Sequence, residues 1–269
     1  MALGVLNNIS AIYAQNNLNN TQAALNTTLQ QLSSGSRINS GADDAAGLSL
    51  ANDLQASSTA LSQSASNASE GVDFLQVADG ALSQVTNLLN RAVTLATEAS
   101  NGVLNTDQSN AADAEYQNIL TEIGKIDTNT EYNGINVFST AASIFTSDGT
   151  LNQTDAGTAL GSVVTAAGLT GTDLKTGDAT TALGDITTAI GAIATERGTA
   201  GADINTLQAV SNVMSTESTN TLSAENDVTA TDYGTATSNM SKEQILMQTG
   251  IAALSQAQQS QQLVTKLLQ

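Results

Sequence analysis

Two adjacent carboxylates, Asp43 and Asp44, have types and a spacing that could perform chemistry. A carboxylate pair can act as general acid and base, or it can hold a metal ion. Here the pair comes immediately before a long stretch with helical periodicity, where the positive end of the helix macrodipole favours acidic residues. We therefore interpret both residues as helix N-terminal acids and not as a catalytic pair.

A second run of oxygen ligands has the alternation of a calcium-binding loop. Asp127, Asn129 and Glu131 stand two residues apart. However, Tyr132 occupies the position where such a loop needs a glycine, and Phe138 the position where it needs a bidentate glutamate. We expect no calcium site in this segment.

The chain contains no His and no Cys. The missing His removes the commonest general base and metal ligand, and the missing Cys removes thiolate chemistry and disulfides. Several Asn-x-Ser/Thr triplets occur, for example at Asn8, Asn26, Asn67 and Asn152, and chance explains them in a chain so rich in Asn and Thr. The sequence predicts a protein that is not an enzyme and that uses no cofactor or metal.

Charge and hydropathy exclude two classes of partner. The formal net charge is -18, from 25 acidic and 7 basic residues, and the cations are spaced one by one along the chain. Nucleic-acid binding needs a clustered basic footprint, which the sequence lacks. No apolar run is long enough to cross a membrane, and the first residues do not have the pattern of a cleavable signal peptide. If the protein is exported, we expect a dedicated route.

The elements that must position any functional residue are predicted to be long helices. The hydrophobic fraction is 40%, but much of it is Ala, with 3 Phe, 4 Tyr and no Trp. There is no Pro to interrupt a helix. This composition favours thin helical packing over one bulky core.

The first helix is expected over residues 1 to about 35. Leu18, Leu25 and Leu32 recur every seven residues, and Leu29 fills an intervening position, as in a coiled-coil seam. The remaining positions carry Asn, Gln and Thr where a solvated helix usually carries Lys and Glu. Such a helix suits a location surrounded by other protein.

Two further helices are expected, over about 43 to 102 and about 107 to 129. The first alternates apolar spacings of three and four, and its seam residues are Leu75, Ala78, Leu82, Val85, Leu89, Ala92, Ala96 and Ala99. The second presents Tyr116, Ile119, Ile123 and Ile126 on one face. Arg91 is a lone cation in the first of these helices, either a solvated surface charge or a contact to a partner.

Residues from about 130 to 178 have a different character. Gly, Thr, Ser and Asp punctuate short β-type runs from Ile135 to Phe138 and from Ser143 to Thr146, and Ser147 to Thr150 has the composition of a hairpin turn. We expect a small β subregion here.

Helix is expected again from about 179 and in a final segment of about 241 to 269. A Thr- and Ser-rich stretch up to about 235 separates the two. The penultimate helix repeats apolar residues at spacings of three and four, with Arg197 at one seam position. These residues are Leu183, Ile186, Ile190, Ile193, Ala200, Ile204, Leu207 and Met214. The final helix places Leu246, Gly250, Ala253, Ala257, Val264 and Leu268 on one stripe. Amphipathic helices at both ends, with β material between them, predict that the two ends lie side by side.

Four segments resemble bacterial flagellin, the protein of the flagellar filament. They are LQQLSSGSRINSGADDAAGLSLAN from Leu29 to Asn52, NLLNRAVTLATEASNG, EYNGINVF and the closing SNMSKEQILMQTGIAALSQAQQSQQLVTKLLQ. The resemblance covers about residues 1 to 140 and 180 to 269. On these motifs the chain is identified as a member of that family, in a short form without large outer domains.

The resemblance implies a mainly α fold of long antiparallel helices. Residues 1–42 and 229–269 would form an inner coiled-coil domain, and residues 43–228 a helical rod domain with the small β region at 130–178. The residues expected to pack subunits together are Leu18, Leu25, Leu29, Leu32, Leu246, Ala253, Val264 and Leu268.

The resemblance also implies partners and a location. The chain would polymerise with itself in the extracellular filament, after export in an unfolded state through the flagellar type III apparatus. It would meet hook–filament junction and cap proteins, and an export chaperone would hold the helix at about 241 to 269. A host Toll-like receptor is a further partner, whose motif falls on Arg91, Leu95 and Glu115, although Val93 replaces a cation common in that motif.

Three other functions remain open at this level. A filament-junction protein would share the terminal helices but would be made in far fewer copies. Some flagellins carry a zinc protease in the central insertion, which the absence of His argues against. A secreted immune ligand or adhesin is the third, and receptor and motility assays compared side by side would distinguish it.

Overall fold

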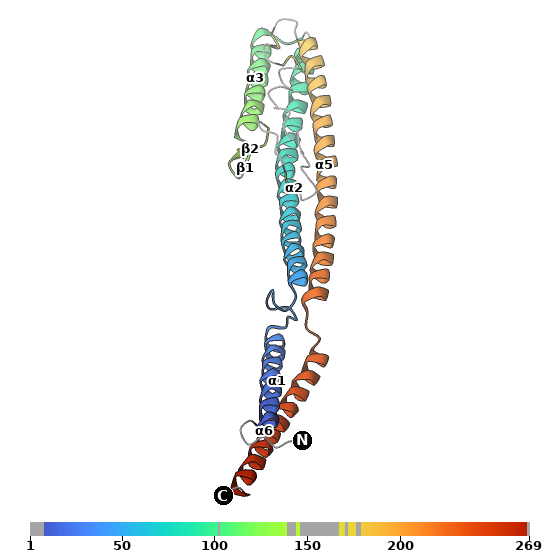
Figure 1. The fold of residues 1–269 in the computed structure, drawn as a ribbon. Helices are drawn as coiled ribbons and strands as arrows, with labels where there is room; N and C mark the ends of the chain where they lie inside the picture. Colours follow the sequence, from blue (N-terminus) through green and yellow to red (C-terminus); the bar gives the residue numbers. More distant parts are fainter. Residues whose placement is uncertain are drawn as a thin grey trace. The chain divides into compact units, whose positions relative to one another are not determined.

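The computed structural model describes residues 8–101, 103–138, 144–145, 167–169, 172–175 and 179–267. Within these residues the chain is mainly α (Figure 1). The elements are, in order, α1 (Ile9–Ser34), α2 (Ala45–Ala99), α3 (Thr106–Asn129), β1 (Glu131–Tyr132), β2 (Ile135–Asn136), α5 (Ala179–Thr229) and α6 (Tyr233–Leu267). The prediction of a mainly α protein is confirmed.

Local side chains mark where these helices begin and end. Asn8 caps α1 by accepting a hydrogen bond from the Ala11 N–H at 3.0 Å, and Gly35 ends it in the left-handed conformation, with φ of 72°. Asn105 and Gln108 form a reciprocal capping box at the start of α3. Helix boundaries therefore follow from short-range hydrogen bonds that the sequence encodes directly.

The chain divides into two compact units. The terminal-helix unit comprises residues 1–56 and 220–269, and the central unit comprises residues 57–219. The boundaries fall inside α2 and α5, so each of these helices contributes residues to both units.

The central unit holds a continuous apolar core formed by α2, α3 and α5. Cross-helix contacts show that α2 and α5 run antiparallel: the Ser58 and Ser218 hydroxyls lie 3.2 Å apart, and Arg197 Nε donates to Asp79 Oδ1 at 2.7 Å. The predicted α2 seam is confirmed, with Leu75, Val85 and Leu89 completely buried. Its remaining members from Ala78 to Ala96 are also buried, and Ala99 packs against the same core.

The predicted seams of α3 and α5 contribute to the same core. Tyr116, Ile119 and Ile123 of α3 are buried, and Ile126 packs against them. Fully buried core side chains from α5 include Ile186 and Leu207. Heptad spacing therefore predicted this core well, because buried helix positions recur at three and four residues wherever antiparallel helices pack.

The β-hairpin is shorter and lies earlier than the sequence suggested. Strands β1 and β2 pair antiparallel, Glu131 with Asn136 and Tyr132 with Ile135. Asn133 and Gly134 form the turn, with φ of 52° and 76°. An Asn-Gly pair adopts these positive φ values readily, so this dipeptide was the turn signal that the sequence reading missed.

The expected β subregion is otherwise only partly described. Val137 and Phe138 form a turn, which corrects the predicted strand from Ile135 to Phe138. Ile144 and Phe145 are described and are not in a strand, while the predicted turn from 147 to 150 lies outside the described residues.

The Thr- and Ser-rich stretch belongs mostly to α5, which continues to Thr229, and the final helix α6 begins at Tyr233 instead of at about residue 241 as predicted. Thr and Ser have modest helix propensity, but tertiary pairing overrides it. Several threonine hydroxyls near the end of α5 donate to the carbonyl four residues earlier, as Thr216 does to Asn212 and Thr229 to Glu225, both at 2.9 Å. These polar side chains thus find partners without leaving the helix.

Candidate interaction surfaces

The terminal helices α1 and α6 pack antiparallel along a narrow seam. Asn8 Nδ2 donates to the Ala257 carbonyl at 2.9 Å, and a methyl group added at Gly250 would lie 3.3 Å from Leu18 Cδ1. At the other end, Thr231 N–H donates to the Gly35 carbonyl at 3.0 Å. The two helices are therefore in contact along most of the length of α1.

The seam follows a strict heptad pattern on both helices. Its α1 positions are Ala11, Ala14, Leu18, Thr21, Leu25, Thr28 and Leu32, and its α6 positions are Ala236, Met240, Glu243, Met247, Gly250, Leu254 and Ala257, all buried or half-buried. Small and polar side chains fill about half of these places. The seam consequently buries little apolar surface for its length.

The outer faces of the same helices are rich in exposed large apolar side chains. Tyr13 is 66% exposed and Ile245 is 63% exposed. Among the described side chains of these two helices, the set is Ile9, Ile12, Tyr13 and Leu29 on α1, and Tyr233, Ile245, Leu246 and Ile251 on α6. Soluble monomers rarely gather so many large apolar groups on one pair of helices.

The residues predicted to pack subunits divide between these two surfaces. Leu18, Leu25 and Leu32 lie in the α1–α6 seam, whereas Leu29 and Leu246 are exposed. Ala253 is also exposed and adjoins the seam position Leu254. The side chain of Val264, and the whole of Leu268, lie outside the described residues.

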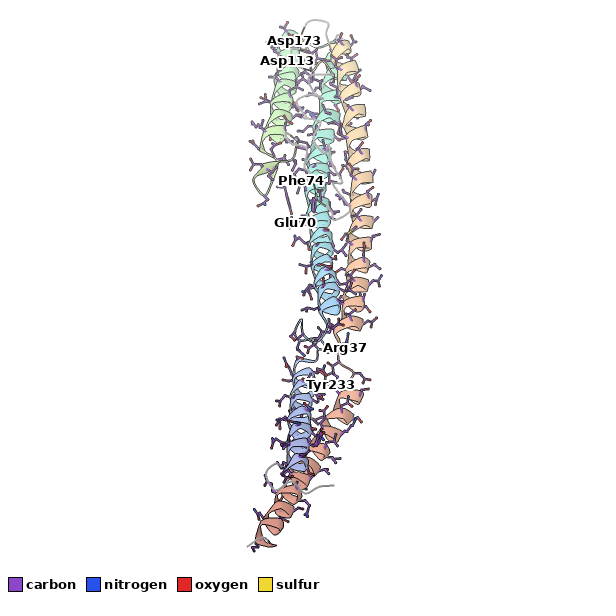
Figure 2. All side chains as sticks on the ribbon, viewed as in Figure 1. Arg37, Glu70, Phe74, Asp113, Asp173 and Tyr233 are labelled. Atoms are coloured by element: carbon purple, nitrogen blue, oxygen red, sulfur yellow. The ribbon has the colours of Figure 1, made fainter. Side chains whose placement is uncertain are left out.

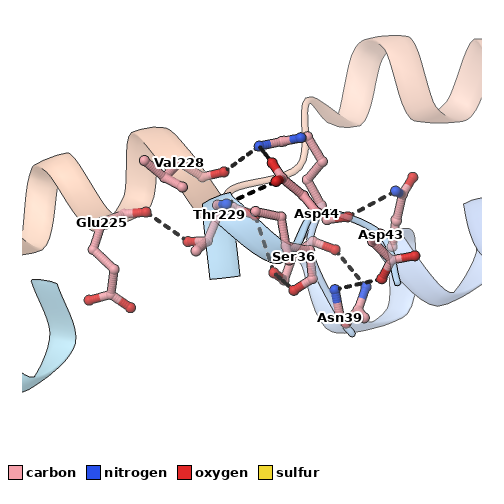
Figure 3. Close-up of polar contacts among 11 residues, drawn as sticks. Ser36, Asn39, Asp43, Asp44, Glu225, Val228 and Thr229 are labelled. Carbon is pink, nitrogen blue, oxygen red and sulfur yellow. Dashed lines mark hydrogen bonds and ion pairs between the residues drawn. The ribbon is translucent and has the colours of Figure 1, made fainter. Parts of the chain in front are cut away.

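A polar junction joins the segment after α1 to the end of α5 (Figure 3). Arg37 donates from its backbone N–H to the Thr229 carbonyl at 2.6 Å and from its guanidinium to the Val228 carbonyl at 2.9 Å. Its guanidinium also lies 3.7 Å from Asp44 Oδ2. The sequence reading treated this segment as a simple break, because the partners of Arg37 are about 190 residues away.

The carboxylate pair at 43 and 44 has a structural role. Asp44 Oδ1 accepts from the Gly47 N–H at 2.8 Å at the start of α2, as expected of a helix N-terminal acid. Asp43 instead accepts from the backbone N–H groups of Asn39 and Ser40. Hydrogen bonds from the Asn39 N–H, then from the Ser40 hydroxyl and N–H, hold the pKa of Asp43 below its usual value.

Arg91 of α2 and Glu115 of α3 form a bidentate ion pair in the central unit. Arg91 Nε and Nη2 donate to the two carboxylate oxygens at 2.7 and 3.0 Å. This hydrogen bonding raises the pKa of Arg91 and lowers that of Glu115. Leu95, which the resemblance groups with them, is 3% exposed and belongs to the apolar core. The structure therefore presents Arg91 and Glu115 together at the surface and Leu95 beneath it.

A second ion pair attaches the segment 172–175 to α3, near the labels of Asp113 and Asp173 in Figure 2. Asp113 has a side chain 4% exposed, accepts from the Leu174 N–H at 3.0 Å and lies 2.8 Å from Lys175 Nζ. Burial by itself raises the pKa of Asp113, but the bonds from Lys175 and Leu174 outweigh it and lower the pKa. Sequence reasoning missed this pair, since Lys175 lies in a segment without periodicity.

Aromatic and glycine contacts complete the central unit. Phe74 of α2, labelled in Figure 2, meets Tyr132 of β1 edge to face, with ring centroids 6.1 Å apart. Gly71 lies against Ile144, so that a methyl group at Gly71 would overlap Ile144 Cδ1. These contacts hold the hairpin and residue 144 against α2.

The described residues form neither a cluster of metal ligands nor a membrane-spanning helix. In the part of the chain that the structure describes, no three carboxylates come together as metal ligands would. Among the same residues, no helix combines the length and the hydropathy that a bilayer crossing requires.

Comparison with known proteins places both ends of the chain in one family. Residues 5–143 match the bacterial flagellin N-terminal helical region, and residues 183–268 match the bacterial flagellin C-terminal helical region. The solved crystal structure of Bacillus cereus flagellin is 32% identical, with a TM-score of 0.48 over 55% of this chain and 88% of that chain.

Full-length relatives are considerably longer than the stretch they share with this chain. Flagellin 1 of Proteus mirabilis is 37% identical over 139 residues, which are 52% of this chain and 38% of that protein. Flagellin of Salmonella muenchen is 38% identical over 139 residues, which are 28% of that protein. From the matches at its two ends, we conclude that the chain belongs to the bacterial flagellin family.

Proposed function

We propose that this chain is a structural, non-enzymatic subunit that polymerises into the extracellular flagellar filament of a bacterium. Its family membership supports this role, as do the flagellin names of its relatives. In this proposal residues 1–42 and 229–269 form the inner coiled-coil domain, and residues 43–228 form the rod domain.

The observation that carries the proposal is the exposed apolar surface of α1 and α6. Each large apolar side chain contributes about 1.5–3 kcal/mol when it passes from full exposure to burial. The eight exposed groups described on these helices therefore leave a substantial driving force unused in a single copy. Open polymerisation, in which the same surfaces meet head to tail, would bury them.

The two classes of predicted packing residue then have different roles. Leu18, Leu25 and Leu32 stabilise the α1–α6 pair within one copy, whereas Leu29 and Leu246 contact neighbouring copies. Because the seam itself is thin, we propose that polymerisation completes the folding of the terminal helices.

The test replaces exposed apolar residues and measures fibres. We expect Leu29→Asn combined with Leu246→Asn to prevent fibres in electron microscopy and pelleting assays, while circular dichroism shows that the central helices remain folded. Thr249→Asn, at an exposed polar position of α6, is the matched control and should assemble normally. Normal fibres from the double Leu variant would refute the proposed role of this surface.

The finer proposals concern export and assembly partners. We propose that the chain passes unfolded through a type III apparatus, is held beforehand by a chaperone at 241–269, and meets junction and cap proteins at assembly. A thin seam supports export, because few stable contacts must be undone before threading. Deleting 241–269 should abolish both chaperone binding and fibres, and chaperone binding by the truncated chain would contradict this assignment.

A receptor contact is the second candidate function, and the Arg91–Glu115 pair supports it. We propose that these two side chains bind a host Toll-like receptor in the free subunit, or a neighbouring subunit in the filament. Their charges are exposed and preorganised in one geometry. Exchanging both residues, as Arg91→Glu with Glu115→Arg, should keep the pair while reversing its polarity, and should abolish receptor signalling if this contact is used.

A further inference from the structure

Among the described residues of the α1–α6 seam, Glu243 is the one charged side chain. Helix α1 contains no charged residue, and the other two charged residues of α6, Lys242 and Lys266, are exposed. Glu243 is half-buried, and its Oε2 atom is buried without a hydrogen bond from any described residue. Buried acceptors without a donor are uncommon in native proteins, so this one calls for an explanation.

The register of the two helices places Glu243 opposite an apolar residue. Gly250 of α6 lies against Leu18 of α1. Seven residues further along each antiparallel helix, the same face of α6 carries Glu243 and that of α1 carries Leu25. Leu25 is 5% exposed and its side chain has no polar atom, so the residue level with Glu243 offers it no donor.

The neighbouring seam positions offer no donor either. Thr21 and Thr28 flank Leu25 on α1, but their hydroxyls donate to backbone carbonyls four residues earlier in that helix, at 2.9 and 3.1 Å. A hydroxyl has a single hydrogen to donate, so both are already engaged. On α6 the flanking seam residues are Met240 and Met247, which have no side-chain donor.

A carboxylate oxygen in such surroundings opposes the pairing of the two helices. When α1 and α6 are apart, water hydrates both oxygens of Glu243. When the helices pair, Oε2 loses its water and gains no hydrogen bond within the described residues. The buried carboxylate of the central unit, Asp113, is different, because it accepts from the Leu174 N–H and pairs with Lys175. The cost therefore falls on the region whose seam has the least apolar contact to offset it.

We propose that Glu243 is a restraint built into the seam, which keeps the terminal helices of a free copy less stably paired than their heptad spacing alone would allow. Its effect within one copy stands by itself, whereas its consequence for fibres rests on the proposed self-assembly. Only paired helices present the exposed apolar faces of α1 and α6 in a fixed geometry. Weaker pairing therefore raises the concentration at which copies polymerise.

Hydrogen exchange of the full-length free chain tests the restraint. Glu243→Gln removes the charge with little change in size, and Glu243→Met gives the position the residue type of its seam neighbours. We expect Glu243→Gln to slow the exchange of α1 and α6 amides about tenfold, because a neutral amide costs less to desolvate than a carboxylate. Glu243→Met should slow it at least as much. The α2 amides of residues 75–89 are the internal reference and should be unchanged.

Moving the charge by one position separates burial from net charge. Gln244 is exposed, so Glu243→Gln combined with Gln244→Glu keeps the composition and net charge of the unaltered chain but places the carboxylate in solvent. This double variant should be as strongly protected as Glu243→Gln alone. Unchanged or faster exchange in Glu243→Gln, or loss of the gain in the double variant, would refute the restraint.

Fibre formation provides a second measurement. The same three variants should lower the critical concentration for fibres about tenfold, if the gain in pairing is carried fully into assembly. This direction is opposite to that expected for the Leu29 and Leu246 substitutions. If unaltered chains form no fibres, the proposed function fails, while the exchange of the free chain still decides whether Glu243 restrains pairing. If unaltered chains form fibres but the variants do not lower the critical concentration, the restraint on assembly is refuted.

Discussion

The α1–α6 pair and the central unit are both built from antiparallel helices with apolar residues at heptad spacing, yet they bury them to very different extents. In the central unit the seam residues Leu75, Val85 and Leu89 have no exposed surface, and a third helix covers α2 and α5. In the terminal pair the seam is half Ala, Thr and Gly, and large apolar groups face outward.

The two regions also differ in whether ion pairs join their segments within one copy. The central unit contains Arg91–Glu115, Lys175–Asp113 and Arg197–Asp79, which join separate segments of one copy. Among the described residues of α1 and α6, no ion pair forms within one copy. The comparison teaches that the central unit buries its apolar side chains and pairs its charges within one copy, while the terminal pair leaves large apolar side chains exposed. The predictions below test this contrast, from the largest expected effect to the smallest.

Truncation of a central core residue should have the largest effect. Leu89→Ala removes a completely buried side chain, and we expect it to lower the free energy of unfolding by about 2–5 kcal/mol. Urea unfolding followed by circular dichroism measures this change. Leu25→Ala is the matched substitution in the α1 seam, and it should leave the main transition in place while it weakens fibre formation. Equal shifts of the main transition by both variants would break the comparison.

Loss of the Asp113 carboxylate should come next. Asp113→Asn leaves the Lys175 ammonium unpaired and weakens the bond from the Leu174 N–H, at an expected cost of about 1–3 kcal/mol. Because the folded pKa of Asp113 lies below its unfolded value, its stabilising contribution is present above the unfolded pKa and is lost as the pH falls through the lowered folded pKa.

Stability measured against pH distinguishes this group from other acids. The native chain should lose this contribution below about pH 4, which is the usual range of an unfolded aspartate. In Asp113→Asn that part of the acid dependence should be absent. An unchanged acid dependence in the variant would show that the ion pair does not hold residues 172–175 on α3.

Two glycines of α2 offer a matched pair of substitutions. Gly71→Ala should destabilise the central unit by about 1–3 kcal/mol, because the added methyl group overlaps buried Ile144. Gly80→Ala meets no atom within 4 Å and should stabilise the helix by about 0.5–1 kcal/mol. Thermal unfolding measures both shifts, and stabilisation by both would indicate that Ile144 moves freely away from Gly71.

The surface pair Arg91–Glu115 should have the smallest effect on stability. Its side chains are 53% and 45% exposed, so solvent screens their interaction. We expect Arg91→Ala and Glu115→Ala to leave the urea midpoint almost unchanged. A marked loss of stability would assign the pair a structural role, whereas an unchanged fold with weaker receptor or subunit binding would sharpen its role as a contact.

Much of the fold could be predicted from periodicity alone. The α2 seam, the α3 face of Tyr116 and Ile123, and the start of α5 at Ala179 agree with the sequence reading, because buried positions of long helices recur at three and four residues. The errors fall where local propensity was weighed without tertiary context. Thr-rich residues up to Thr229 remain helical, and the hairpin turns at Asn133 and Gly134.

The candidate site was less predictable from the sequence. Leu29 and Leu246 have the same residue type as Leu18 and Leu25, yet they are exposed while the latter lie in the seam. A heptad pattern with apolar residues on more than one stripe does not say which stripe faces the partner helix. That choice depends on the helix rotation that packing selects, and only the structure provides it.

The sequence by itself determined the mainly helical architecture, the lack of His and Cys chemistry, the acidic charge and the motifs of the flagellin family. These depend on composition and on spacing within single segments. The tertiary structure alone decided which residues from distant segments meet, such as Arg37 with Val228 and Asp113 with Lys175. The physical reason is that such contacts depend on how helices far apart in the sequence pack together, which no local pattern encodes.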